Sequence, residues 1–189
     1  MICLPDPHNA LRGFFFAHVG WLLTRKHPDI FIKGRNLNIS DLIEDPVIRF
    51  QRKYYPLLYI TFCFLLPTLL CHYLIGHTWF DSLIVGSFGR YIVSLHCTWF
   101  VNSAAHMWGD RPYKKGSEPR ENTWVSIATW GEGFHNFHHV FPYDYAVSET
   151  GYKLDPMRWF IDLMAQVGHV WGRKRASPYV IHLAREKNL

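Results

Sequence analysis

The residues His135-Asn-Phe-His138-His139 carry the clearest chemical signal in this sequence. In a helix of 3.6 residues per turn, positions i, i+3 and i+4 lie on one face, so the three imidazoles would point the same way. Imidazole is a common ligand of transition metals, whereas three histidines buried in a core would each need a hydrogen-bonding partner. The pattern therefore predicts one wall of a metal site.

A second segment offers donors at helical spacing. Asn102 and His106 stand at positions i and i+4, which again share one helical face. We expect the amide and the imidazole to form the opposite wall of the same metal site. Two of the remaining histidines, His18 and His96, are expected to be structural residues that are satisfied by hydrogen bonds.

Two apolar stretches are candidates for membrane spans. Residues 56–75 carry no Asp, Glu, Lys or Arg, and about 20 apolar residues suffice to cross a bilayer. Residues 83–101 are a weaker second span, because Arg90 interrupts them. We expect an antiparallel hairpin closed at residues 76–78, with Arg90 either paired inside it or reaching to the interface. Two buried helices of a soluble protein are the alternative interpretation.

Basic residues are concentrated beside the apolar stretches. The formal net charge is +5, and the bases occur in runs at 25–27, 52–53, 114–115 and 173–175. Because Lys and Arg next to membrane spans stay cytosolic, we expect residues 1–55 and 102–189, with both termini, in the cytosol. The placement fits a membrane surface or an anionic cofactor better than nucleic acid, for which no recognition motif is present.

The cysteines and the N-terminus add little chemistry. The four cysteines have no paired metal-ligand spacing and are expected to be reduced thiols: Cys3, Cys63, Cys71 and Cys97. The sequence before residue 6 is too short for a cleavable signal peptide. The glycosylation sequon at Asn38 would lie in the cytosol, so we expect it to be unmodified.

The remaining pattern predicts cytosolic helices and loops. Helices are expected at residues 9–23, 41–55, 123–139 and 159–170. Ser40 is the expected N-cap of the second helix, Gly131 and Gly133 weaken the third, and the fourth has an apolar stripe at helical spacing. Residues 109–122 are expected to be a loop, 141–145 an aromatic turn and 170–189 a basic tail. The fold class predicted is all-α, in one partial domain that is integral to the membrane.

Several of these motifs resemble the membrane acyl-CoA desaturases of the stearoyl-CoA type. Residues 131–145 are similar to the third histidine box of that family with its flanks. The segment from Asn102 to His106 and the triplet Arg111-Pro-Tyr113 resemble the region that follows the last membrane span. Residues 14–23 and Arg25-Lys-His-Pro28 are also similar to the family, so that the resemblance covers residues 6–175.

The resemblance implies a non-haem enzyme of the endoplasmic reticulum membrane with two iron ions. Such enzymes use dioxygen and electrons from cytochrome b5 to insert a cis double bond into a fatty acyl-CoA, typically at the ninth carbon. Oxidising an unactivated methylene requires redox metals with open positions, and a bent apolar tunnel fixes which carbon reacts. The iron ligands implied are Asn102 (through a water), His106, His135, His138 and His139.

The resemblance also implies substrate contacts. Thr98 and Trp99 correspond to residues that line the acyl tunnel, and Arg25 and Lys26 to residues that contact the CoA phosphates. Three of them have a simpler interpretation: Trp99 as a core aromatic, and Arg25 and Lys26 as positive anchors at the membrane surface. Glu132 beside the third box could orient a histidine ligand or be a solvated helix residue.

Two earlier histidine boxes of the family, H-x4-H and H-R-x-H-H, do not occur in this chain. Two irons need roughly ten donor positions, more than the four imidazoles and one amide supply. We therefore expect an N-terminally truncated desaturase that is inactive alone. The alternatives are a non-catalytic membrane protein that binds or interferes with full-length desaturase, and a related di-iron hydroxylase, which would lack Arg111-Pro-Tyr113 and the aromatic turn.

Overall fold

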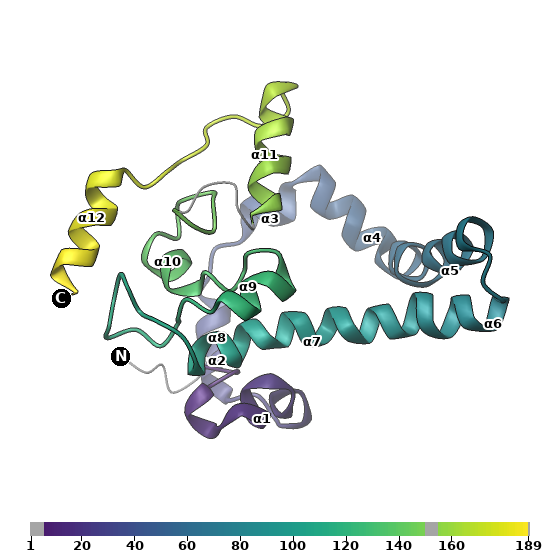
Figure 1. The fold of residues 1–189 in the computed structure, drawn as a ribbon, viewed down its shortest axis with the longest axis horizontal. Coiled ribbons are helices and arrows are strands. Elements are labelled where there is room, and N and C mark those ends of the chain that lie inside the picture. Colours follow the sequence, from purple (N-terminus) through teal and green to yellow (C-terminus); the bar gives the residue numbers. More distant parts are fainter. Residues whose placement is uncertain (1–5, 150–154, 189) are drawn as a thin grey trace. The chain divides into compact units, whose positions relative to one another are not determined.

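The computed structural model describes residues 6–149 and 155–188, and its regular elements are helical (Figure 1). Within these residues there is no strand, only isolated backbone bridges that join Asp110 to Glu121 and Glu121 to Phe134. The expected all-α class is therefore confirmed. The chain divides into two compact units, which we call the hairpin unit (residues 26–96) and the histidine unit (residues 6–25 and 97–189).

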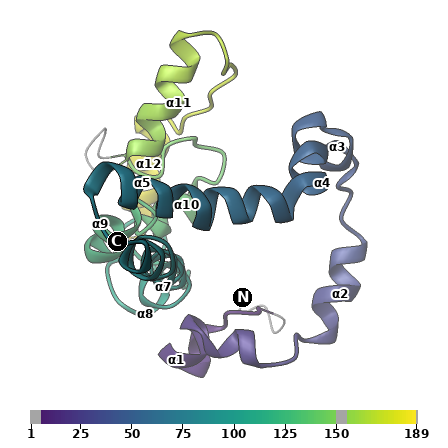
Figure 2. The same ribbon diagram turned by 90° about the vertical axis from the view of Figure 1, so that its right-hand side faces the viewer.

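The hairpin unit is a succession of helices, of which α2, α3 and α4 follow one another with a bend at each junction (Figure 2). Three of its segments are π-helical, namely η3, η4 and η5. The elements are α2 (Pro28–Arg35), α3 (Ser40–Glu44), α4 (Pro46–Ile60), η3 (Thr61–Leu65), α5 (Leu66–Leu70), η4 (Cys71–Ile75), α6 (Trp79–Asp81), η5 (Ser82–Gly89) and the start of α7 (Arg90–Asn102).

We expected one helix at residues 41–55 with Ser40 as its N-cap, and this prediction is wrong about where the helix starts. Ser40 is the first residue of the short helix α3, and a second helix, α4, begins at Pro46. Asp45 caps α4, because its Oδ1 accepts hydrogen bonds from two backbone N–H groups of the first turn, at 2.8 and 3.1 Å. Pro46 explains the break, since proline fits the first turn of a helix and disrupts an interior.

One helix among the described residues, Pro46–Ile75, is long and apolar enough to cross a membrane, with a mean hydropathy of 1.9. It contains all of the predicted span at 56–75, and only a small share of its most apolar part is buried. Gly76 ends it with φ of 83°, a left-handed conformation that glycine adopts without steric cost. The Thr78 hydroxyl then accepts a hydrogen bond from Asp81 N and starts the return helix.

The two arms pack as the expected helical hairpin, in which α5 contacts η5. Polar bonds join the arms: Thr68 Oγ1 lies 2.7 Å from Ser87 Oγ, and Arg90 Nη2 donates to Cys63 O at 2.7 Å. Arg90 is thus paired inside the hairpin, one of the two roles expected for it. The predicted second span at 83–101 lies within continuous helix, and its insertion in a membrane stays a prediction.

The histidine unit begins with three short helical segments in place of the single helix expected at residues 9–23. Gly13, with φ of 96°, separates the first two segments. The unit's elements are η1 (Ala10–Arg12), α1 (Phe14–His18), η2 (Gly20–Leu23), the end of α7, α8 (Ala104–Met107), α9 (Thr123–Thr129), α10 (His135–Val140), α11 (Pro156–Gln166) and α12 (Pro178–Lys187).

The helix expected at residues 123–139 is two helices. Trp130 (φ 61°) and Gly131 (φ 114°) take positive φ values that end α9, and α10 starts at His135. The sequence indicates Gly131 as a weak point of this helix, whereas backbone propensity does not predict a left-handed tryptophan. The predicted loop at 109–122 is confirmed as non-helical.

The histidine unit has two hydrophobic clusters among its described residues, of which the more aromatic one includes Phe137 of α10. It comprises Tyr113, Phe137, Phe141, Ala176 and Ile181. Ile181 belongs to α12, a helix within the segment that we expected to be a basic tail, so that expectation was wrong. α11 also differs from its prediction, because Asp155 caps it and Pro156 begins it, three residues before the expected start.

The described cysteines are free thiols, as expected: Cys63, Cys71 and Cys97. Cys3 and the signal-peptide prediction lie outside the described residues.

Candidate metal centre

His106 lies in α8, directly after the turn that follows α7. At that turn the Ser103 hydroxyl donates to Trp99 O at 2.8 Å and lies 3.0 Å from His18 Nδ1. Both Ser103 and His18 are buried, so losing this contact would leave polar groups without water or a partner. His18 is therefore a structural histidine, as predicted, and it fixes the turn that presents His106.

The second wall of the site comes from α10. His135 and His139 are one helical turn apart, and their Nε2 atoms are 3.1 Å from each other. His135 Nε2 is also 3.1 Å from His106 Nε2. The three ligand nitrogens all lie within 4.8 Å of one another. The two segments singled out in the sequence thus meet at His106, His135 and His139.

These separations fit a metal ion. Nitrogen ligands lie about 2.1 Å from a bound transition metal, so adjacent ligands are about 3 Å apart in six-coordinate and about 3.4 Å apart in four-coordinate geometry. Two of the pairs, at 3.1 Å, match adjacent positions around one ion. Three imidazoles leave coordination positions open, which suits redox chemistry better than a closed structural site.

The protein keeps these imidazoles neutral. Burial, reinforced by His106, His139 and His138, lowers the pKa of His135 to about 3. Burial likewise lowers the pKa of His106, with Asp6 acting in the opposite direction. Partial burial lowers the pKa of His139, helped by His138 and His106. Neutral imidazole is the form that binds metal, so the site needs no deprotonation at neutral pH.

Two predicted ligands lie outside this group of three. His138 is exposed, and its ring centre is 6.0 Å from that of His135 and 5.6 Å from that of His139. Asn102 is half-buried at the last position of α7. The roles of His138 and Asn102 as iron ligands stay predictions.

Asn136, inside the histidine box, anchors α10 and was missed from the sequence. It is fully buried, and its Oδ1 accepts hydrogen bonds from Tyr113 N (3.0 Å) and Lys114 N (3.3 Å). Its Nδ2 donates to Ser117 Oγ at 2.9 Å and to Pro119 O at 3.0 Å. The sequence shows only that this amide stands between predicted metal ligands. Its hydrogen-bonding partners come from a loop whose path no local pattern predicts.

Arg120 connects the two histidine segments through its backbone and its side chain. Its N–H donates to Ala105 O at 2.7 Å, and its carbonyl accepts from His135 N at 3.3 Å. Its Nε donates to His106 O at 3.3 Å. The loop at 109–122 therefore sets the distance between α8 and the start of α10.

Glu121 holds the next turn of α10. Its Oε1 accepts a hydrogen bond from Phe137 N at 2.7 Å. Burial raises the pKa of Glu121 to about 7, and the backbone hydrogen bonds from Phe137 and Asn136 oppose that rise. Glu132, the acid that the sequence had suggested as a partner of the histidines, is exposed, as a solvated residue would be.

The predicted substrate residues lie on several segments. Trp99 is half-buried with its ring edge-on to His18 at 5.7 Å between centres, and Thr98 is exposed. Arg25 and Lys26 are exposed neighbours in the chain that fall at the boundary between the two units. The assignments of these four residues to substrate binding stay predictions.

The sequence has curated relatives with closely similar sequences. It is 50% identical to human stearoyl-CoA desaturase 5, 53% identical to mouse stearoyl-CoA desaturase 4 and 52% identical to human stearoyl-CoA desaturase. Each match spans 182 residues, 96% of this chain, and covers 55%, 51% and 50% of those relatives. The chain thus spans about half the length of the curated relatives it matches. No protein-family model matches it.

Proposed function

Because this chain belongs to the acyl-CoA desaturase family, we propose that it takes part in the dioxygen-dependent insertion of a cis double bond, at the ninth carbon, into a saturated fatty acyl-CoA. The observation that carries the proposal is the convergence of His106, His135 and His139, with two nitrogen separations of 3.1 Å, from the two segments that resemble family ligand positions.

The reaction fixes what the site must supply. A saturated –CH2–CH2– unit loses two hydrogens, and dioxygen takes up these, two electrons and two protons to give two waters. Bound iron supplies the oxidising chemistry, because protein side chains alone cannot oxidise an unactivated methylene. Cytochrome b5 is the proposed source of the two electrons.

The residues of this chain have positioning roles in the proposal. The neutral imidazoles of His106, His135 and His139, with His138 and a water on Asn102, would supply this chain's share of the ligands to the two iron ions of the family site. Trp99 and Thr98 line the apolar passage that presents one methylene to the metals, since holding the reacting carbon in place determines where the double bond forms.

The CoA group is proposed to bind at the exposed pair Arg25 and Lys26. Guanidinium and ammonium groups suit the phosphates of CoA, which carry charge that cannot enter an apolar passage. Both side chains are exposed to solvent, which fits contact with a water-soluble headgroup.

We propose that the protein is an integral endoplasmic reticulum membrane protein, with spans at about 56–75 and 83–101 and with residues 1–55 and 102–189 in the cytosol. The exposed apolar helix Pro46–Ile75 and its antiparallel partner support the hairpin. The bases at 52–53 and 114–115, on the outer flanks of the hairpin, support the orientation.

A chimera tests the proposal. In yeast without its own acyl-CoA desaturase, this chain replaces the matching segment of human stearoyl-CoA desaturase, and cis-9 fatty acids are measured by gas chromatography. We expect the chimera to restore them, His135→Ala to abolish them and the exposed His182→Ala to leave them unchanged. A membrane-inserted chimera without product would overturn the proposal. Expression of this chain alone in the same yeast shows whether it is active without the rest of the human desaturase.

A further inference from the structure

Arg90 is a strong base inside the second predicted span, and the proposed function does not use it. Its Nη2 donates to Cys63 O at 2.7 Å, and this bond between the two arms lies at the surface of the hairpin. Among the described residues the guanidinium makes no other hydrogen bond or ion pair, although it has five N–H donors. The side chain is exposed, so most of its donors are available to a partner.

The bond between Arg90 and Cys63 lies deep in the proposed membrane spans. Arg90 precedes residue 101, the cytosolic end of its span, by eleven residues of α7, which is about 16 Å. Cys63 follows residue 56, the cytosolic end of the other span, by seven residues, which is about 10 Å. Because the hydrocarbon core is about 30 Å thick, the bond lies near its middle, and Arg90 cannot reach a lipid phosphate.

The hairpin does not supply a counter-charge at this depth. Residues 56–101 contain one acidic residue, Asp81, which lies in α6 at the turn and accepts a hydrogen bond from Thr78 Oγ1 at 2.7 Å. A charged side chain inside a bilayer is costly, and such residues face other protein and pair with it. A second copy of this hairpin would bring another arginine and no acid to this level. The partner therefore has to carry its own carboxylate.

The backbone around Arg90 suits a close helical neighbour. Gly89 precedes it, and a Cβ at Gly89 would have one heavy-atom neighbour within 4 Å, Ile84 O at 3.4 Å. Small residues allow membrane helices to approach one another closely. The π-helical segment η5 ends directly before Arg90, and η3 contains Cys63. Such segments are rare and are frequent at functional sites.

We propose that the surface of the hairpin around Arg90 binds a further membrane-spanning helix, which carries a carboxylate at the depth of Arg90. The proposal rests on the proposed membrane insertion of the hairpin and on none of the catalytic assignments. Charge complementarity selects a helix with Asp or Glu over an uncharged helix. Depth selects a spanning helix over a lipid headgroup.

Energy transfer between the full chain and a synthetic helix in lipid vesicles tests the proposal separately from desaturation. The probe is a transmembrane peptide of about 20 Leu and Ala residues with one Glu at its centre, and a second peptide has Gln in that place. We expect tighter association with the Glu peptide. Arg90→Gln should weaken that association roughly ten-fold and leave the Gln peptide unaffected.

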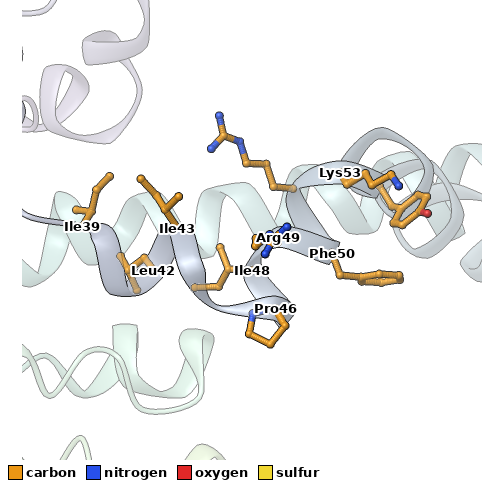
Figure 3. Close-up of a pocket in the computed structure, with 10 residues that line it drawn as sticks. Ile39, Leu42, Ile43, Pro46, Ile48, Arg49, Phe50 and Lys53 are labelled. Carbon is orange, nitrogen blue, oxygen red and sulfur yellow. The ribbon is translucent and has the colours of Figure 1, made fainter.

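Lys53→Gln is the matched control, because Lys53 is an exposed base of α4 near the cytosolic end of the first span, beside the groove between α3 and α4 (Figure 3). It should leave the association unchanged. Arg90→Lys keeps the charge and should keep the preference for Glu. Circular dichroism checks that each variant stays helical.

Three results would overturn the proposal alone: equal affinity for the two peptides, equal loss in Arg90→Gln and Lys53→Gln, or loss of the preference in Arg90→Lys. Carbonate extraction of the vesicles tests the insertion on which the proposal rests. A chain that carbonate removes would overturn the proposed spans and this inference together.

Discussion

His106 Nε2 and His135 Nε2 lie 3.1 Å apart, although 29 residues separate the two histidines in the chain. The loop between them brings the two histidines together, because the backbone of Arg120 is hydrogen-bonded to Ala105 on one side and to His135 on the other. Two neutral imidazole nitrogens at this distance either share one proton or bind a common metal ion. The relative positions of His106 and His135 therefore depend on the loop that joins α8 to α10.

Asn136→Ala should destabilise the histidine unit by about 2 to 4 kcal/mol. The substitution removes a buried amide and leaves the N–H groups of Tyr113 and Lys114 without their acceptor. Chemical unfolding of the solubilised chain measures the change. Gln166→Ala, at an exposed position, is the control and should fall within about 0.5 kcal/mol of wild type. Similar stabilities for the two variants would contradict the anchoring role of Asn136.

Gly133→Ala should disturb the start of α10, because the structure leaves no room for a side chain at this position. A Cβ at Gly133 would lie 2.3 Å from Ser126 N and 2.4 Å from Asn122 O, which are backbone atoms that cannot rotate away. Gly116→Ala is the control, because its Cβ would meet open space. We expect a loss of about 3 kcal/mol or more for Gly133→Ala. Equal unfolding midpoints for the two variants would refute this packing.

Glu121→Gln should change how stability depends on pH. The folded chain raises the pKa of Glu121 from 4.5 to about 7, so between these values the folded state keeps a proton that the unfolded state has lost. Its contribution is therefore most favourable below pH 4.5 and is lost as the pH rises through 7. From pH 5 to pH 8 the wild type should lose on the order of 3 kcal/mol relative to Glu121→Gln.

The glutamine variant keeps an oxygen acceptor for Phe137 N, so the comparison isolates the ionisation. Glu132→Gln is the matched control, since Glu132 is exposed and lies in the turn just before α10. The unfolding free energies of wild type, Glu121→Gln and Glu132→Gln at pH 5 and pH 8 measure this effect. Parallel pH dependence in wild type and Glu121→Gln would mean that Glu121 titrates normally.

His138→Ala separates the predicted ligand set from the group of three. If His138 binds iron, as the family position implies, the chimera with His138→Ala should lose cis-9 fatty acid formation while its membrane insertion is unchanged. Its exposed ring, about 6 Å from that of His135, should cost the fold little when removed. Retained product formation in His138→Ala would exclude it as a ligand.

The local features of this structure could be predicted from the sequence. Helical spacing identified the histidines of α10 and, separately, the pair Asn102 and His106, because helical periodicity is a local property. Uninterrupted apolarity likewise predicted the helix at residues 56–75. Both predictions concern residues whose neighbours in space are also neighbours in the chain.

The long-range part could not be predicted in the same way. In the sequence, Asn136 is only a polar residue in a predicted helix. Its hydrogen-bonding partners lie in the loop at 109–122, which is distant in the chain. Ile181 lies in a charged segment, and the core that it joins includes Tyr113, Phe137 and Phe141, which lie far earlier in the chain. The left-handed Trp130, which divides the expected helix, is contrary to the backbone preference of a bulky residue.

The iron content of the purified chain tests the central claim most directly. Wild type, His135→Ala and the control His182→Ala are prepared anaerobically with ferrous iron, and bound metal is measured by mass spectrometry after removal of excess. Convergence of His106, His135 and His139 predicts bound iron in wild type and in His182→Ala, and its loss in His135→Ala. Equal iron in all three proteins would contradict a metal site at these histidines.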